Sequence, residues 1–307
     1  MKVASPVLFA ALALSLSPRF AVSQVPLMQR KAALHQWYRQ DFSVENTPTG
    51  LAFDGSNIWV TNLNGASVTK IRAIDGAKLG SFPVGSSPER VLFDGENIWV
   101  ANVGSNSVTK LRASTGANLG TFRVGHHPLG MAFDGANVWV ANRFDNFVTK
   151  IRASDGAVLG NFTVDFDPTS ITFDGANMWV ESVFGTVTEL RASNGATLGT
   201  FPAPPGFDIV FDGANVWIAG FYSSSVTKIR ASDGATIGTF PVGNAYVLTF
   251  DGDHIWVGSA DGTITKLAAS DGRNLEAIPG SWGLEGIAFD GANIWTTNVN
   301  SNVVSKH

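Results

Sequence analysis

The chain has 307 residues, no cysteine, 15% charged residues and a formal net charge of −4. The lack of cysteine excludes disulfide frameworks, cysteine-ligated zinc, iron–sulfur clusters and thiol catalysis. The net negative charge argues against a protein that binds nucleic acid through a basic face. Hydrophobic residues make up 44% of the chain, so it can bury a large core, and intrinsic disorder is excluded.

Residues 1–23 have the pattern of a secretory signal peptide. Lys2 precedes an apolar run at residues 7–16, and Ala21-Val22-Ser23 places small residues at the cleavage positions before Gln24. This run is too short to cross about 30 Å of hydrocarbon as a helix. We therefore expect an exported protein, periplasmic or extracellular, without stable membrane insertion.

Residues 24–40 differ in composition from the rest of the chain. Leu34, Trp37 and Tyr38 recur at helical spacing between residues 29 and 40, with three basic residues around them. The pattern predicts a short amphipathic helix lying on one face of the main domain. The alternative is a basic helix that binds a partner or a membrane surface.

From residue 41 to residue 307 the sequence repeats one unit seven times. The tripeptide Phe-Asp-Gly recurs at intervals of 40, 40, 40, 38, 39 and 39 residues, and a Trp follows each Phe by six residues. The seven Phe–Trp pairs are Phe53–Trp59, Phe93–Trp99, Phe133–Trp139, Phe173–Trp179, Phe211–Trp217, Phe250–Trp256 and Phe289–Trp295. A near-constant period of about 40 residues is typical of a repeat architecture.

Each unit contains four strand-like segments separated by turns. In the third unit the predicted strands are Gly130–Phe133, Val138–Asn142, Val148–Ala153 and Leu159–Val164. Asp-Gly dipeptides follow the first and third of them and favour tight turns. Four antiparallel strands per unit, repeated seven times, predict an all-β, seven-bladed β-propeller.

The two ends of the repeat region predict how the ring closes. Asp41–Val44 resembles the fourth strand of a unit, while the seventh unit stops after its third strand, Val303–Lys306. Pairing these two segments completes the seventh blade and removes two open sheet edges. We expect the repeated Phe and Trp side chains to pack between neighbouring blades.

The sequence around the first repeated Trp resembles a known family. Ile58-Trp59-Val60-Thr61-Asn62, followed by Ser67-Val68-Thr69-Lys70-Ile71, resembles the YVTN family of bacterial and archaeal β-propeller repeats. The resemblance implies a propeller over residues 41–307 in a mostly extracytoplasmic family without an assigned role. The units are also similar to those of virginiamycin B (streptogramin) lyases, which use a metal and a His/Glu site. Because neither Glu-x-His nor His-x-Glu occurs here, the resemblance assigns no catalytic residue.

The seven units differ mainly in their fourth-to-first connections and second-to-third loops. Strand alternation places both sets on one face, and variable loops on a rigid framework commonly carry binding. Units two to four contribute the polar residues Glu89, Arg90, His126, His127, Arg143, Asp145, Asp165, Asp167 and Glu181. Units four to seven contribute Phe184, Phe207, Phe221, Tyr222, Tyr246, Trp282 and the acid Glu285. A polar side and an aromatic side suit a carbohydrate, a peptide or an amphipathic small molecule.

The position of these residues in the unit predicts where they lie. Residues that stand four positions before the Phe of a Phe-Asp-Gly should surround the mouth of the central channel, which we call the axial mouth. Arg90 and Asp208 stand three positions before that Phe and should approach the channel itself. Glu181 is expected to pair with Arg90 or Arg143. The histidines are expected to be solvated; the alternative is a metal bound by His126 or His127 with Asp165 or Asp167.

These patterns predict an exported, monomeric binding module with its site on the variable-loop face around the central channel. The expected partner is a small molecule, carbohydrate, peptide or protein, with no cofactor. The ligand-binding candidates are Glu89, Arg90, His126, His127, Arg143, Glu181, Phe207, Asp208, Tyr222, Tyr246, Trp282 and Glu285. One alternative is a metal-assisted lyase or lactone-cleaving enzyme with a divalent cation at the central opening. The other is a structural envelope protein without a ligand.

Overall fold

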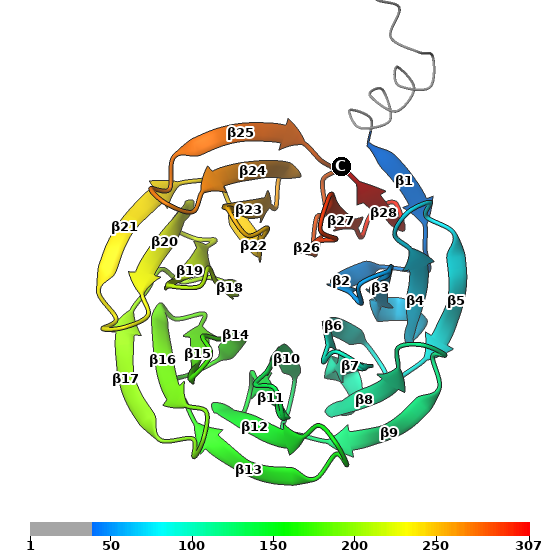
Figure 1. Cartoon of the computed structure of the whole chain (residues 1–307), viewed down its shortest axis with the longest axis horizontal. Helices are drawn as coiled ribbons and strands as arrows, with labels where there is room; N and C mark the ends of the chain where they lie inside the picture. Colours follow the sequence, from blue (N-terminus) through cyan, green and yellow to red (C-terminus); the bar gives the residue numbers. More distant parts are fainter. Residues whose placement is uncertain (1–38) are drawn as a thin grey trace, which may run out of the picture. The chain divides into compact units, whose positions relative to one another are not determined.

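The computed structural model describes residues 39–307, which form seven four-stranded antiparallel sheets. Figure 1 shows these sheets as blades around a central axis, with the first strand of each blade innermost. The predicted seven-bladed β-propeller is therefore confirmed. The predicted signal peptide, and the predicted helix apart from its last two residues, lie outside the described residues.

The blades follow the chain order of the repeats. Blade one contains β2 (Pro48–Phe53), β3 (Asn57–Asn62), β4 (Ser67–Arg72) and β5 (Lys78–Pro83). Blade two contains β6 (Pro88–Phe93), β7 (Asn97–Asn102), β8 (Ser107–Arg112) and β9 (Asn118–Arg123). Blade three contains β10 (Pro128–Phe133), β11 (Asn137–Asn142), β12 (Phe147–Arg152) and β13 (Val158–Thr163). Blades four and five contain β14 (Pro168–Phe173), β15 (Asn177–Ser182), β16 (Thr186–Arg191) and β17 (Thr197–Pro202); and β18 (Asp208–Phe211), β19 (Asn215–Gly220), β20 (Ser225–Arg230) and β21 (Thr236–Pro241). Blades six and seven contain β22 (Ala245–Phe250), β23 (His254–Ser259), β24 (Thr263–Ala268) and β25 (Asn274–Pro279); and β26 (Ile287–Phe289), β27 (Ile294–Asn298), β28 (Val303–Lys306) and β1 (Gln40–Ser43). Short 3₁₀ turns, Leu63–Gly65 and Val103–Ser105, lie in the second-to-third loops of blades one and two.

The ring closes by pairing of the first and last strands. β1 and β28 are antiparallel, with Phe42 opposite Val304 and Asp41 opposite Ser305, and they lie side by side in Figure 1. The Ser305 hydroxyl donates to the Asp41 carboxylate at 2.6 Å. β1 begins at Gln40, so this residue belongs to the propeller and not to the predicted helix.

Each Phe-Asp-Gly turn is tied to the Trp of its own blade, as the third blade illustrates. The Asp134 carboxylate accepts backbone hydrogen bonds from Ala136 and Asn137, at 2.9 and 2.6 Å, which stabilises the turn. It also accepts from Trp139 Nε1 at 2.8 Å. Burial favours the neutral acid, but these donors outweigh it and hold the pKa of Asp134 below its usual value. The repeated Asp thus serves both the turn and the buried indole.

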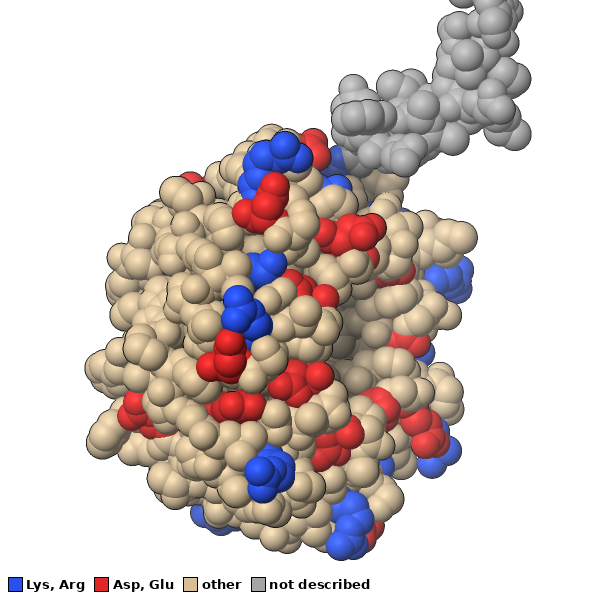
Figure 2. Space-filling view, turned by 60° about the vertical axis from the view of Figure 1, so that its left-hand side comes forward, with Lys and Arg blue, Asp and Glu red and all other residues tan. Residues whose placement is uncertain are grey.

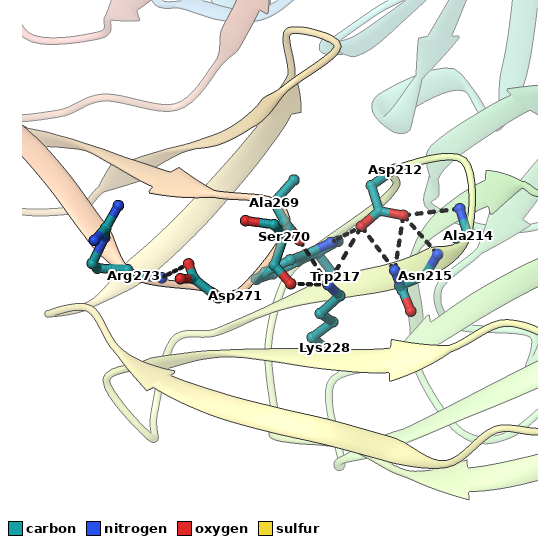
Figure 3. Close-up of polar contacts among 9 residues, drawn as sticks. All are labelled: Asp212, Ala214, Asn215, Trp217, Lys228, Ala269, Ser270, Asp271 and Arg273. Atoms are coloured by element: carbon teal, nitrogen blue, oxygen red, sulfur yellow. Dashed lines mark hydrogen bonds and ion pairs between the residues drawn. The ribbon is translucent and has the colours of Figure 1, made fainter.

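A lysine on the third strand then links one blade to the next. Lys150 Nζ lies 4.8 Å from the centre of the Trp139 ring and donates to the Ala192 carbonyl of the fourth blade at 2.7 Å. The same arrangement in the fifth blade joins Lys228 to Ala269 of the sixth blade, beside Trp217 and Asp212 (Figure 3). We call this contact the lysine latch.

Apolar layers between neighbouring blades form the core. One layer joins Trp59 and Val68 of blade one to Ile98, Val100 and Leu111 of blade two. These five side chains are fully buried, as expected for packing between blades. Within the part of the chain from residue 39 onward, no helix is long and apolar enough to cross a membrane.

Charged side chains are scattered over the surface. The face visible in Figure 2 carries separate basic side chains beside acidic ones, and acidic side chains surround a hollow near its middle. On this face there is no continuous basic patch.

Candidate functional site

The innermost strands enclose an axial pocket of about 190 Å³. Each strand contributes its residue three positions before the Phe of Phe-Asp-Gly, and the seven are Gly50, Arg90, Gly130, Ser170, Asp208, Val247 and Gly286. Glycine is needed where strands approach closely: a Cβ on Gly130 would lie 2.5 Å from the Cα of Ser170. Arg90 and Asp208 therefore face a narrow space with few other side chains.

Arg90 extends from the second blade toward the seventh. Its Nη1 donates to the Glu285 carbonyl at 3.0 Å, in the connection before β26. Burial disfavours the charged form of Arg90 and would lower its pKa. The net effect is nevertheless a raised pKa, because the charged form is favoured by four neighbours: Asp208, Tyr246, Glu89 and Glu285. The guanidinium is therefore a stable cation inside the axial mouth.

Asp208 begins the inner strand of the fifth blade and is held by three donors. Its carboxylate accepts from the Ser170 hydroxyl at 2.8 Å and from the backbone amides of Ile209 and Leu248 at 3.1 and 2.8 Å. Burial raises the pKa of Asp208, although Arg90 and these donors oppose the shift. Arg90 and Asp208 attract one another across the pocket, yet no direct ion pair joins them in the described chain.

Glu181, on β15, is buried with no partner. Its exposed fraction is 0%, and neither carboxyl oxygen has a hydrogen-bond partner. Burial raises its pKa well above the usual value; Asp208 adds to the shift and Arg90 opposes it. The environment of Glu181 therefore favours its neutral, protonated form.

The predicted pairing of Glu181 with Arg90 or Arg143 was wrong. Arg143 instead forms an ion pair with Asp167 at 2.5 Å, and Arg90 donates to the Glu285 carbonyl. Glu181 points toward the next blade, where a Cβ on Gly206 would lie only 2.6 Å from Glu181 Oε1. The inner strand of that blade is short and starts only at Asp208, so Gly206 leaves room for the acid.

Four rings beside the pocket form what we call the aromatic cluster: Phe207, Phe221, Tyr222 and Tyr246. Their contacting pairs have centroids 5.1–6.0 Å apart. Tyr246 lies next to the Glu285 carboxyl, and burial raises its pKa, so its hydroxyl stays protonated. Tyr222 is 68% exposed. The aromatic cluster therefore extends from the axial mouth to solvent.

The predicted histidine pair lies in the loops of the third blade. The His126 imidazole contacts the Asp145 carboxylate at 2.8 Å and remains largely exposed. The His127 ring packs on Phe144 at 4.4 Å, and burial lowers its pKa. Within residues 39–307 no three metal-ligating side chains come together, so neither histidine has the predicted metal partners.

The remaining acid of this region, Asp165, accepts from the Thr186 hydroxyl at 2.6 Å. The carboxylates of Asp145 and Asp167 likewise have side-chain partners within the protein. The acids outside the axial mouth therefore stabilise their own loops.

The division into a polar and an aromatic side is less strict than predicted. Trp282 and Phe184 are 73% and 71% exposed on the variable loops, but Phe144 and Phe166, from the expected polar side, are also 63% and 66% exposed. Sequence reasoning missed these two rings although they lie in the same variable loops. It also missed Ser170, whose position before Phe-Asp-Gly matches that of Arg90 and Asp208.

Comparisons with known proteins support the fold. No family model matches the chain, and no curated protein matches it. A solved streptogramin B lyase has a TM-score of 0.75 at 15% identity, covering 88% of this chain and 96% of its own. A Kuenenia stuttgartiensis hydrazine synthase structure has a TM-score of 0.75 at 18% identity, covering 85% of this chain and 95% of its own. At these identities the similarity shows a shared β-propeller fold, and the YVTN resemblance stays a prediction.

Proposed function

We propose that this protein is an exported, monomeric binding module that takes a small ligand at the axial pocket on its variable-loop face. The observation that carries the proposal is the arrangement of Arg90 and Asp208. Both line one narrow pocket, and no direct ion pair joins them. A buried charge is costly unless it is paired, so a ligand that contacts both groups would gain from interactions that the protein leaves incomplete.

Size and composition of the site restrict the ligand. The pocket volume of about 190 Å³ is below the roughly 300–1,000 Å³ of drug-sized sites. We therefore infer a small molecule, or one end of a longer one whose body lies outside the pocket. The aromatic cluster continues from the pocket to the exposed Tyr222 ring and offers a stacking surface for such a body.

The lyase alternative has less support from the residues themselves. The similarity to streptogramin B lyase concerns the fold, and the resemblance transfers no catalytic residue to this chain. No group of three metal-ligating side chains occurs between residues 39 and 307. A purely structural role leaves unexplained why a cation, Arg90, and an acid, Asp208, line the axial pocket.

A ligand screen tests the proposal. Thermal shift and titration calorimetry would be run with divalent metal chlorides, mono- and disaccharides, amino acids, amines and short peptides. A ligand at 100 times its Kd stabilises the protein by about 2.7 kcal/mol. Asp208→Asn should abolish that shift, and Asp145→Asn, on the same face but outside the pocket, should keep it. No shift with any compound, or unchanged binding by Asp208→Asn, would contradict the proposal.

A further inference from the structure

The axial mouth holds more acid than base. Four carboxyl groups, those of Glu89, Glu181, Asp208 and Glu285, act on the single guanidinium of Arg90. They come from blades two, four, five and seven, so the excess of acid results from the ring closure and not from one acidic segment. Like charges in a narrow, poorly solvated space repel strongly.

Glu181 is the acid of this group whose two carboxyl oxygens have no hydrogen-bond partner. Its two oxygens are fully buried without a partner, beside Asp208 and the Gly206 backbone. Buried polar groups in folded proteins nearly always have a partner, so an orphaned carboxyl next to a pocket indicates an incomplete site. Here the protein supplies one cation to the mouth, and a second cation would reduce the excess of acid.

Asp208 still has room for one more donor. A carboxylate has about four lone-pair positions, and three donors occupy Asp208: the Ser170 hydroxyl and two backbone amides. Asp208 and Arg90 both line the axial pocket, so a ligand there can reach the Asp208 carboxylate. An N–H donor with positive charge fits the remaining position best, because hydrogen bonds between ionised groups are the stronger ones.

The aromatic cluster strengthens the preference for a cation. Tyr246 lies beside Glu285, and Phe207 packs against Tyr246 at 5.4 Å, so aromatic rings lie close to the acids. Aromatic faces attract ammonium and guanidinium groups. The same protein uses this contact inside its blades, where Lys70 Nζ lies 5.0 Å from the centre of the Trp59 ring.

We propose that the ligand of the axial pocket carries a primary ammonium or guanidinium group, which binds at Asp208 and Glu285 with its carbon chain against the aromatic cluster. This inference rests on the proposed binding function and names the class of ligand. An anionic ligand would meet the excess of carboxylates, and a neutral polyol would leave that excess uncompensated.

A bound cation should also displace the proton of Glu181. The charged groups that act on Glu181 are Asp208 on β18 and Arg90 on β6; Glu89, Glu285 and Tyr246 act in turn on Arg90. A second positive charge beside Asp208 favours the ionised form of Glu181. Binding should therefore release up to about one proton and become tighter as the pH rises.

Calorimetry with paired probes tests this inference on the full-length protein. The cationic probes are cadaverine and agmatine, and 1,5-pentanediol is the neutral counterpart of cadaverine. We expect cadaverine to bind at least about tenfold more tightly than the diol and to lose affinity with added salt. Titration in phosphate and in HEPES, whose ionisation enthalpies differ and which carry no primary ammonium group, measures the proton released.

Three variants separate the contributions. Glu181→Gln should bind cadaverine without releasing a proton, and Glu285→Gln, at the mouth, should bind several-fold more weakly. Glu276→Gln, exposed on β25, is the matched control and should behave as the wild type. If Glu181→Gln does not fold, the Glu285→Gln variant and the comparison of cadaverine with the diol still decide the result.

The outcomes distinguish this inference from the proposed function. Equal or tighter binding of 1,5-pentanediol or of a sugar would overturn the preference for a cation while leaving a binding module in place. Cadaverine binding that is unaffected by Asp208→Asn would place the cation elsewhere and overturn the inference. If neither cations nor any other compound of the ligand screen binds, the proposed function itself fails.

Discussion

The Glu189 carboxylate occupies the position in the fourth blade that the Lys150 ammonium occupies in the third. Lys150 is paired with Trp139 across β11 and β12, and Glu189 is paired with Trp179 across β15 and β16. The fourth blade therefore lacks the lysine latch to the fifth. Asn177 Nδ2 donates to Glu189 Oε1 at 2.8 Å instead of to the turn aspartate. Burial raises the pKa of Glu189, and the neighbouring Asp174 adds to the shift.

Replacing Glu189 by Lys should stabilise the protein. The new ammonium would lie over Trp179, near Asp174, and within reach of the Ala231 carbonyl, as its counterparts do in other blades. We expect the free energy of unfolding to rise by about 1 kcal/mol. This is less than a fully buried hydrogen bond to a charged group contributes, because the site is half-exposed. Urea unfolding measures the gain. Glu276→Lys makes the same charge change on an exposed strand, and an equal gain there would contradict the latch explanation.

Trp139→Ala should be strongly destabilising. The indole is fully buried, packs against Phe162 with ring centroids 5.2 Å apart and donates to Asp134. We expect a loss of roughly 3–5 kcal/mol in the free energy of unfolding, because the cavity is large and a buried carboxylate loses a donor. Trp282→Ala removes a 73% exposed indole and should change stability by less than about 0.5 kcal/mol. Similar losses for the two variants would refute the assigned roles.

Removing the closing strand should expose a sheet edge. A protein that begins at residue 46 lacks β1, so β28 loses its partner and Trp295 loses its stacking with Phe42 at 5.5 Å. Unpaired edges promote association between chains. We expect light scattering to show oligomers or aggregates, whereas a protein that begins at residue 39 should stay monodisperse. A shortened protein that remains monomeric with unchanged melting would disprove the role of β1.

Glu181 should impose a pH dependence on stability. Its raised folded-state pKa means that the folded protein binds a proton over a pH range in which the unfolded chain has lost it. The corresponding stability is therefore present below the unfolded value of about 4.5 and is lost as the pH rises toward the folded value. Relative to Glu181→Gln, the wild type should become progressively less stable as the pH rises above about 4.5, by up to about 1.4 kcal/mol per pH unit. Urea unfolding of both proteins at several pH values measures this, and parallel curves would show that Glu181 is not buried as a neutral acid.

Much of the fold could be predicted from the sequence because each blade is specified locally. The Phe-Asp-Gly turns, the Trp at a fixed offset and the alternating third strand lie within one unit of about 40 residues. The spare strand at the start and the missing strand at the end, Asp41–Val44 and Val303–Lys306, then indicated the closure. A side chain's position within the unit also placed Arg90 and Asp208 near the axis, since equivalent residues of a ring face the same direction.

The partners of those side chains were decided only by the tertiary structure. Arg90 donates to a carbonyl 195 residues away in the chain, across an axis whose width depends on seven strands packing together. Glu181 lacks the predicted partner because Arg143 lies within reach of Asp167 on the outer loops, and because the short inner strand of the fifth blade leaves a space that no donor fills. A repeat fixes directions within a blade, whereas hydrogen bonding and charge balance at the axis depend on distances between blades, which no single unit encodes.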